Sequence, residues 1–142
     1  MVFRPCPPNK EKAVNTQAMH EVSVETQQGK LTFPQVVQRL LAAGVESYLV
    51  DFAAARKTCY LADGTTHTEP MILDPVAADF NAAGVVAAIR GAQADTIRYP
   101  EFLRLSTAAG VTGYWAFLTG KRVIYFGRKG GQHIEEFPKP RD

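Results

Sequence analysis

The sequence has little cysteine and no long apolar run. Its two cysteines, Cys6 and Cys59, cannot form a disulfide framework, and Cys59 lies in an apolar pattern typical of a small core residue. No stretch approaches the roughly 20 apolar residues that a membrane-spanning helix needs. The first residues also have no apolar segment of a signal peptide. We therefore expect a cytoplasmic protein that does not enter a membrane.

The sequence also has none of the short motifs that mark common catalytic and metal sites. It contains no Gly-x-Gly-x-x-Gly or Walker loop, no serine-nucleophile signature, and no Cys-x-x-Cys or His-Glu-x-x-His pair. A net charge of +2 at pH 7 is too small to indicate nucleic-acid binding by itself. These absences predict no cofactor and no metal, and they leave any reaction undefined.

The composition is that of one globular domain. The chain has 142 residues, of which 46% are hydrophobic and 21% are charged, so it is long enough to bury a core. Residues 1–12 are rich in proline and polar residues, which predicts a flexible N-terminal arm. The domain is then expected over residues 13–138.

The most informative feature is an internal repeat. Residues 31–50 align with residues 97–116, and six of the twenty pairs are identical. The clearest match is Ala-Ala-Gly-Val, which starts at Ala42 and again at Ala108; the interval between these two alanines is here called the repeat offset. A self-match of this length indicates two copies of one structural unit. The predicted copies are repeat one, over residues 14–69, and repeat two, over residues 83–138.

Each repeat has the pattern of two helices followed by three strands. Thr32 and Gln35 form a capping-box pattern at the start of a helix, and Gly44 suits its C-terminal cap. After that glycine the apolar period changes to two, which is typical of strands. The predicted helices cover residues 12–28, 32–43, 83–94 and 100–108, and the predicted strands cover residues 45–52, 57–61, 65–69, 111–118, 122–126 and 132–137.

These elements predict an α+β fold that is internally duplicated. One helix–helix–three-strand unit of roughly 60 residues has a marginal core, whereas two units can bury their apolar faces against each other. We therefore expect a pseudo-twofold arrangement, with antiparallel sheet and the helices on one side. The pattern does not decide whether the two sets of strands form one sheet.

Several short segments, taken together, resemble the YbcV-like family. They are Thr32-Phe33-Pro34, Ala42–Tyr48, Ile97–Phe102, Val123–Arg128 and Gln132–Glu135. The resemblance covers about residues 14–138 and implies a small bacterial protein with a domain of unknown function, sometimes labelled a phage envelope protein. It implies no established reaction, cofactor or catalytic residue. The family's first strand is associated with Tyr-His-x-Asp, where this chain has Tyr48-Leu49-Val50-Asp51.

Two histidines occupy equivalent places in the repeats. His67 and His133 are separated by the repeat offset, and each precedes a glutamate by two positions, Glu69 and Glu135. Residues at i and i+2 lie on the same side of a strand. One hypothesis is therefore a small enzyme in which His133 is a general base oriented by Glu135. The other is that both pairs are polar positions on an edge strand.

Tyrosines also recur in both sets of strands. Tyr48, Tyr60, Tyr114 and Tyr125 fit either core packing or a groove at the seam between the repeats. If a groove exists, His67, His133 and the cation Arg122 join the tyrosines as candidate ligand-binding residues. The favoured function is thus a non-catalytic domain that binds a small molecule or a protein partner at the seam, and the chain is compatible with a homodimer.

The hairpin over residues 121–129 supports a third hypothesis. It carries Lys121, Arg122, Arg128 and Lys129 around two aromatic residues, with Trp115 on the preceding strand. Basic residues interleaved with aromatic ones can hold single-stranded nucleic acid. Charged residues at hairpin tips are more often simply solvated, so nucleic acid is the least favoured partner.

Overall fold

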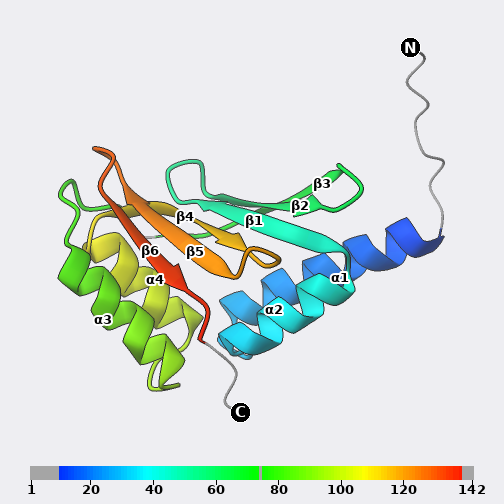
Figure 1. Ribbon diagram of the computed structural model, residues 1–142, viewed down its shortest axis with the longest axis horizontal. Coiled ribbons are helices and arrows are strands. Elements are labelled where there is room, and N and C mark those ends of the chain that lie inside the picture. Colours follow the sequence, from blue (N-terminus) through cyan, green and yellow to red (C-terminus); the bar gives the residue numbers. More distant parts are fainter. Residues whose placement is uncertain (1–9, 74, 139–142) are drawn as a thin grey trace.

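The structure is a computed structural model that describes residues 10–73 and 75–138 (Figure 1). The predicted α+β class is confirmed, since the described residues form four helices and six strands. Repeat one contains α1 (Lys10–Gln27), α2 (Phe33–Ala42), β1 (Val45–Asp51), β2 (Arg56–Leu61) and β3 (Thr66–Pro70). Repeat two contains α3 (Ala82–Gln93), α4 (Tyr99–Ala108), β4 (Val111–Phe117), β5 (Arg122–Gly127) and β6 (Gln132–Glu136).

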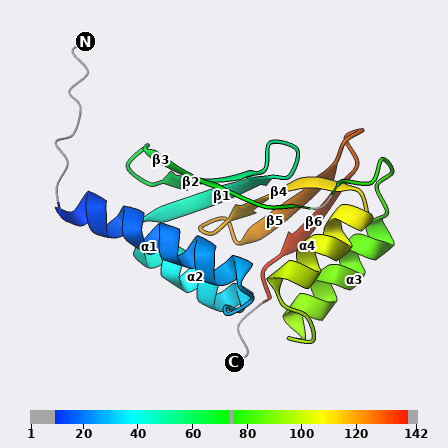
Figure 2. The same ribbon diagram turned by 180° about the vertical axis from the view of Figure 1, so that it is seen from behind.

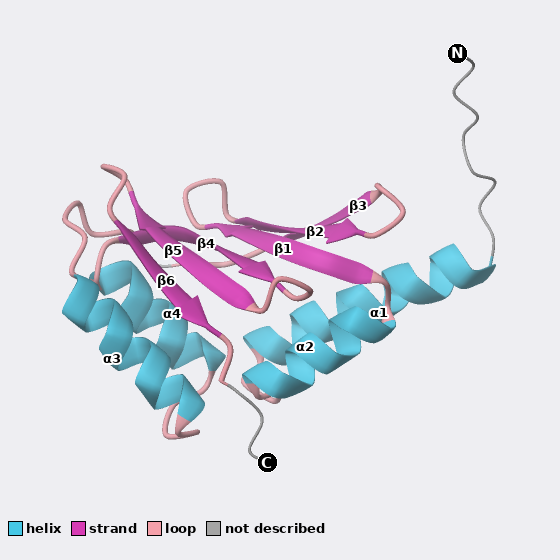
Figure 3. Cartoon of the chain, viewed as in Figure 1, coloured by secondary structure: helices cyan, strands magenta, loops and turns pink. Residues whose placement is uncertain are grey.

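The strands form one antiparallel sheet in the order β3-β2-β1-β4-β5-β6. The two sets of three strands therefore join through β1 and β4, which the sequence left open. All the described helices cover the same face, α1 and α2 over one half and α3 and α4 over the other (Figures 1, 2 and 3). Among the described residues, no helix combines the length and apolarity that a membrane span requires.

The two halves are related by a pseudo-twofold axis. When the repeat offset is added to the first and last residues of α2, β1, β2 and β3, the results are the first and last residues of α4, β4, β5 and β6. Within the central pair of strands, Leu49 lies opposite Trp115, and these two residues are themselves equivalents at that offset. The axis therefore passes between Leu49 and Trp115. It places the same positions of the two repeats on either side of one seam.

The N-terminal boundary differs from the expected one. α1 begins at Lys10, so residues 10–12 are helical and do not belong to an arm. The rest of the expected arm, including Cys6, lies outside the described residues. The other expected boundaries differ from the observed ones by at most two residues.

The local signals act as expected at the second helices. The Thr32 hydroxyl accepts a hydrogen bond from the Gln35 amide, and the Gln35 side chain accepts one from the Thr32 amide, which completes the capping box. Gly44 and Gly110 follow the ends of α2 and α4 with φ of 89° and 84°, a conformation that favours glycine. Arg98 stands at the N-cap of α4 and makes no capping hydrogen bond with its side chain.

The core lies between the sheet and the helices. In β1, Tyr48 and Val50 are buried towards the helices, whereas Ser47 and Leu49 point to the opposite, uncovered face, here called the outer face. Cys59 is buried, as expected. The largest fully buried aliphatic side chains come from helices and strands of both repeats: Val22, Leu40, Val45, Val50, Val85 and Val111.

Candidate functional site

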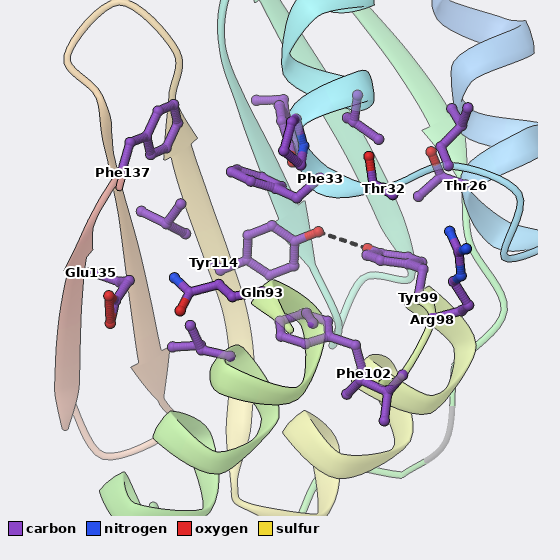
Figure 4. A pocket seen from close by; sticks show the side chains of 18 of the residues that line it. Thr26, Thr32, Phe33, Gln93, Arg98, Tyr99, Phe102, Tyr114, Glu135 and Phe137 are labelled. Atoms are coloured by element: carbon purple, nitrogen blue, oxygen red, sulfur yellow. Dashed lines mark hydrogen bonds between the residues drawn. The ribbon is translucent and has the colours of Figure 1, made fainter. Parts of the chain in front are cut away.

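A cavity of about 200 Å³ lies at the seam, on the helix-covered side of the sheet (Figure 4). We call it the seam cavity. It is lined by residues from both repeats, and many of them are equivalents at the repeat offset. The equivalent lining pairs are Ser23/Ile89, Thr26/Ala92, Gln27/Gln93, Leu31/Ile97, Thr32/Arg98, Phe33/Tyr99, Val36/Phe102, Tyr48/Tyr114, Lys57/Val123 and Met71/Phe137.

Buried tyrosines form part of the cavity wall. Tyr114 lies on β4 close to the axis, and its hydroxyl oxygen is 2.7 Å from that of Tyr99 on α4 (Figure 4). Tyr48 and Tyr125 pack their rings against Tyr114 at centroid distances of 6.1 and 5.5 Å. Burial raises the pKa of all these phenols, so they stay protonated and keep their capacity to donate hydrogen bonds at neutral pH.

A lysine is buried in the same cavity. Lys57 on β2 is only 5% exposed, and its Nζ lies 4.8 Å from the centroid of the Tyr48 ring. Burial lowers the pKa of Lys57, an effect that the nearby Cys59 and Glu69 oppose. Within the described residues, no carboxylate forms an ion pair with this ammonium group at 4.0 Å or less. Lys57 is thus a buried cation that lies against an aromatic ring.

The carboxylate nearest to Lys57 in the sheet is already engaged. Glu69 lies directly opposite Lys57 across the β2–β3 pair. It accepts hydrogen bonds from His67 at 2.7 Å and from His20 on α1 at 3.1 Å. Burial alone would raise the pKa of Glu69, but the two histidines outweigh it and hold this pKa below its usual value. Glu69 therefore acts on Lys57 only at longer range.

Ser23 on α1 is another buried polar residue in the wall of this cavity. It is 3% exposed, and its Oγ has no hydrogen-bond partner in the part of the chain that the structure describes. A buried hydroxyl without a partner costs roughly 1–3 kcal/mol. Ser23 and Lys57 both belong to repeat one.

The other charged residues that line the cavity are paired. Asp95 and Arg98 form an ion pair at 3.3 Å, and Glu136 pairs with Arg122 at 2.9 Å. Glu135 accepts hydrogen bonds from Arg90 at 3.1 Å and from His133 at 3.3 Å. Burial alone would raise the pKa of Glu135, but Arg90 and His133 outweigh it and lower this pKa. Lys57 is the exception among the charged lining residues of the described chain.

The structure divides the candidate residues of the sequence analysis between three places. Tyr48, Tyr114, Tyr125 and Glu135 line the seam cavity. His67 and His133 lie on the edge strands, on the helix side, each bonded to its glutamate as the i and i+2 spacing predicted. They are not among the cavity's lining residues. Tyr60 and Arg122 belong to the outer face and do not line the cavity either.

The outer face carries a short aromatic stack. Trp115 stacks on Tyr60 at a centroid distance of 5.5 Å and on Phe117 at 5.3 Å. Two basic residues at opposite ends of β5 are paired, Arg122 with Glu136 and Lys129 with Asp79. Because these three rings stack on one another, less ring surface is left on which nucleic-acid bases could stack.

Sequence reasoning missed the polar residues that distinguish this cavity. Lys57, Ser23 and Tyr99 were not candidates. A usable signal existed for Lys57: it shares the parity of Cys59 and Leu61 along β2, so the period of two places it on the buried face. Ser23 has no comparable signal, because α1 has a weakly apolar face.

The chemistry of this site is indicated neither by a metal centre in the described residues nor by a similar protein of known function. In the described ranges, no three His, Cys, Asp or Glu side chains are grouped as a ligand set for a metal ion. No protein-family model matches the chain, and no curated protein matches it. The chemistry of the site must therefore be argued from its own residues.

Proposed function

We propose that this protein is a non-catalytic binding domain that holds a small molecule in the seam cavity. The observation that carries the proposal is the cavity itself, which is formed by equivalent residues of both repeats. A cavity of about 200 Å³ suits a ligand of roughly ten non-hydrogen atoms, since an engineered cavity of about 150 Å³ binds benzene. Buried aromatic walls with a few polar groups are typical of such sites.

Two other hypotheses have weaker support. A general base must reach the proton that it abstracts, and His133 is not among the residues that line the cavity, although its partner Glu135 is. Nucleic-acid binding through residues 121–129 is weakened by the internal stacking of Trp115 and by the ion pairs of Arg122 and Lys129. We also propose that the protein belongs to the YbcV-like family and that it is a bacterial, cytoplasmic protein.

The test is a titration with a small neutral probe. Hydrocinnamyl alcohol, which has a phenyl ring on a three-carbon chain, should shift NMR signals of residues around the cavity, with Ile89 and Tyr114 among them. Ala92 lines the cavity, so Ala92→Phe should fill it and weaken binding by at least about tenfold.

Ala87→Phe is the matched control, because Ala87 lies on the same helix and is exposed. It should leave the affinity unchanged. The proposal fails if neither this alcohol nor any member of a fragment library of similar size shifts cavity signals. It also fails if Ala92→Phe and Ala87→Phe bind the probe equally well.

A further inference from the structure

The two sides of the seam cavity differ in polarity at equivalent buried positions. Repeat one places Ser23, Thr26 and Lys57 in the wall. Repeat two places an apolar residue at each of the same positions, namely Ile89, Ala92 and Val123. The pseudo-twofold symmetry of the backbone is thus broken by side-chain chemistry at these three positions, which are polar in repeat one and apolar in repeat two. The carboxylate that lies opposite Val123, Glu135, is already paired with Arg90.

The repeat-one side offers hydrogen-bond donors and a positive charge. An ammonium group has three donors and no acceptor, and Lys57 has no carboxylate in ion-pair range within the described chain. The Ser23 hydroxyl has no hydrogen-bond partner among the described residues, but protein atoms enclose its oxygen, so Lys57 is the group that can meet a ligand. Thr26 is less available, because its hydroxyl is bonded to the backbone oxygen of Val22.

The carboxylate best placed to neutralise Lys57 is held elsewhere. Glu69 faces Lys57 across the strand pair, yet its oxygens accept hydrogen bonds from His67 and His20. In repeat two, the equivalent glutamate, Glu135, lies opposite Val123. Val123 takes the place of Lys57 there and needs no counter-ion. A buried charge is costly unless it is paired, which makes Lys57 a ready partner for an anion.

We infer that the seam cavity selects small molecules with an apolar or aromatic body and a carboxylate at one end. The carboxylate pairs with the Lys57 ammonium group at the repeat-one end. The body packs against Ile89, Ala92 and Val123 at the repeat-two end. This inference rests on the proposed function, since it names the class of ligand for the same site.

A ligand series that varies only the charge of the end group tests the inference. Hydrocinnamate, hydrocinnamyl alcohol and phenylpropylamine share one body and carry an acid, a neutral group and a cation. The wild-type protein should bind the acid at least about tenfold more tightly than the alcohol and should bind the amine weakest. This comparison needs no variant, so it does not depend on the folding of one.

The variant Lys57→Met then assigns the selectivity to one side chain. It should reduce the affinity for hydrocinnamate by about tenfold or more and leave the affinity for the alcohol within about threefold. Lys30→Met is the matched control, because Lys30 is exposed and does not line the cavity. It should change neither affinity.

The outcomes separate the inference from the proposed function. If the wild-type protein binds the alcohol as tightly as the acid, or if Lys57→Met weakens both equally, the carboxylate preference is overturned and the binding cavity stands. If the wild-type protein binds none of the series and no other fragment, the proposed function fails, and the inference fails with it. Loss of the acid preference in Lys30→Met would overturn the role of Lys57.

Discussion

The hydroxyl oxygens of Tyr99 and Tyr114 lie 2.7 Å apart, and this hydrogen bond joins the first turn of α4 to the centre of the sheet. It has no counterpart in the described part of repeat one, where Phe33 replaces Tyr99 and packs against Phe137. The α4 helix also lacks the side-chain cap that Thr32 gives to α2. The hydroxyl pair therefore fixes the start of a helix that has no cap of its own.

Removal of both hydroxyls should cost less than the sum of the two single removals. Tyr99→Phe and Tyr114→Phe each leave a buried hydroxyl without this partner, so each should lower the free energy of unfolding by about 1–2 kcal/mol. The double variant should lose clearly less than the sum, because it leaves neither group unpaired. Urea unfolding of the four proteins gives the coupling energy. Additive losses would show that the two hydroxyls do not depend on each other.

The glycines after α2 and α4 provide a second matched pair. Gly44 and Gly110 have similar positive φ, but an added Cβ at Gly44 meets nothing within 4 Å, whereas at Gly110 it would lie 2.1 Å from the backbone oxygen of Asp79. Gly44→Ala should cost about 1–2 kcal/mol from the left-handed conformation alone. Gly110→Ala should cost at least about 3 kcal/mol, because the segment between the repeats must move.

Thermal or urea unfolding of both variants checks this difference. Equal losses would mean that the segment around Asp79 gives way without cost. That result would contradict the close packing of the connection between β3 and α3 against the end of α4, which the hydrogen bond from the Asn81 amide to the Ala109 oxygen also indicates.

Much of this fold could be predicted from the sequence, because its signals are local. The capping box at Thr32, the cap glycines Gly44 and Gly110, and the period of two after them fix the elements to within two residues. The repeat then predicts the pseudo-twofold relation. What the repeat does not contain is the pairing of β1 with β4, which depends on contacts between the copies.

The candidate site was harder to predict, because a shift of one residue along a strand changes the face. Tyr60 and Tyr125 looked like partners in the two repeats, but the repeat offset pairs Tyr60 with Phe126 and Tyr125 with Cys59. Tyr125 therefore lies in the cavity wall, and Tyr60 lies on the outer face beside Trp115. Lys57 was missed for a different reason. A charged residue in a short strand is usually solvated, so a lysine was not expected in the cavity wall.

The hydrogen bonds of Glu69 predict an acid-sensitive contribution to stability. The folded-state pKa of Glu69 lies below the ordinary value of 4.5, so the stabilisation is present above about pH 4.5 and is lost as the pH falls through the folded pKa. Glu69→Gln should therefore lower the free energy of unfolding by about 1–2 kcal/mol near pH 6, and by much less at pH 3.

Urea unfolding at several pH values tests this dependence. Glu46→Gln is the control, because Glu46 is an exposed residue on β1. It should change stability by less than about 0.5 kcal/mol throughout. A loss in Glu69→Gln that is as large at pH 3 as at pH 6 would show that the side chain acts through shape and not through its charge.

Lys57 should reduce the stability of the free protein, and this effect should fade at high pH. The folded-state pKa of Lys57 lies below the ordinary value of 10.5, so between these two values the unfolded chain binds more protons than the folded one. Stability then rises with pH across that window, and the cost of burying the cation is complete only below the folded pKa. Lys57→Met removes this cost.

We therefore expect Lys57→Met to be more stable than the wild-type protein at pH 7, by about 1–3 kcal/mol, since an apolar side chain of similar length replaces a buried cation. The difference should shrink as the pH rises towards 10. The buried tyrosines titrate in both proteins, so the comparison uses the difference between them at each pH. A variant that is less stable at pH 7 would show that the Tyr48 ring and the distant charge of Glu69 already compensate Lys57, and an anionic ligand would then gain nothing from it.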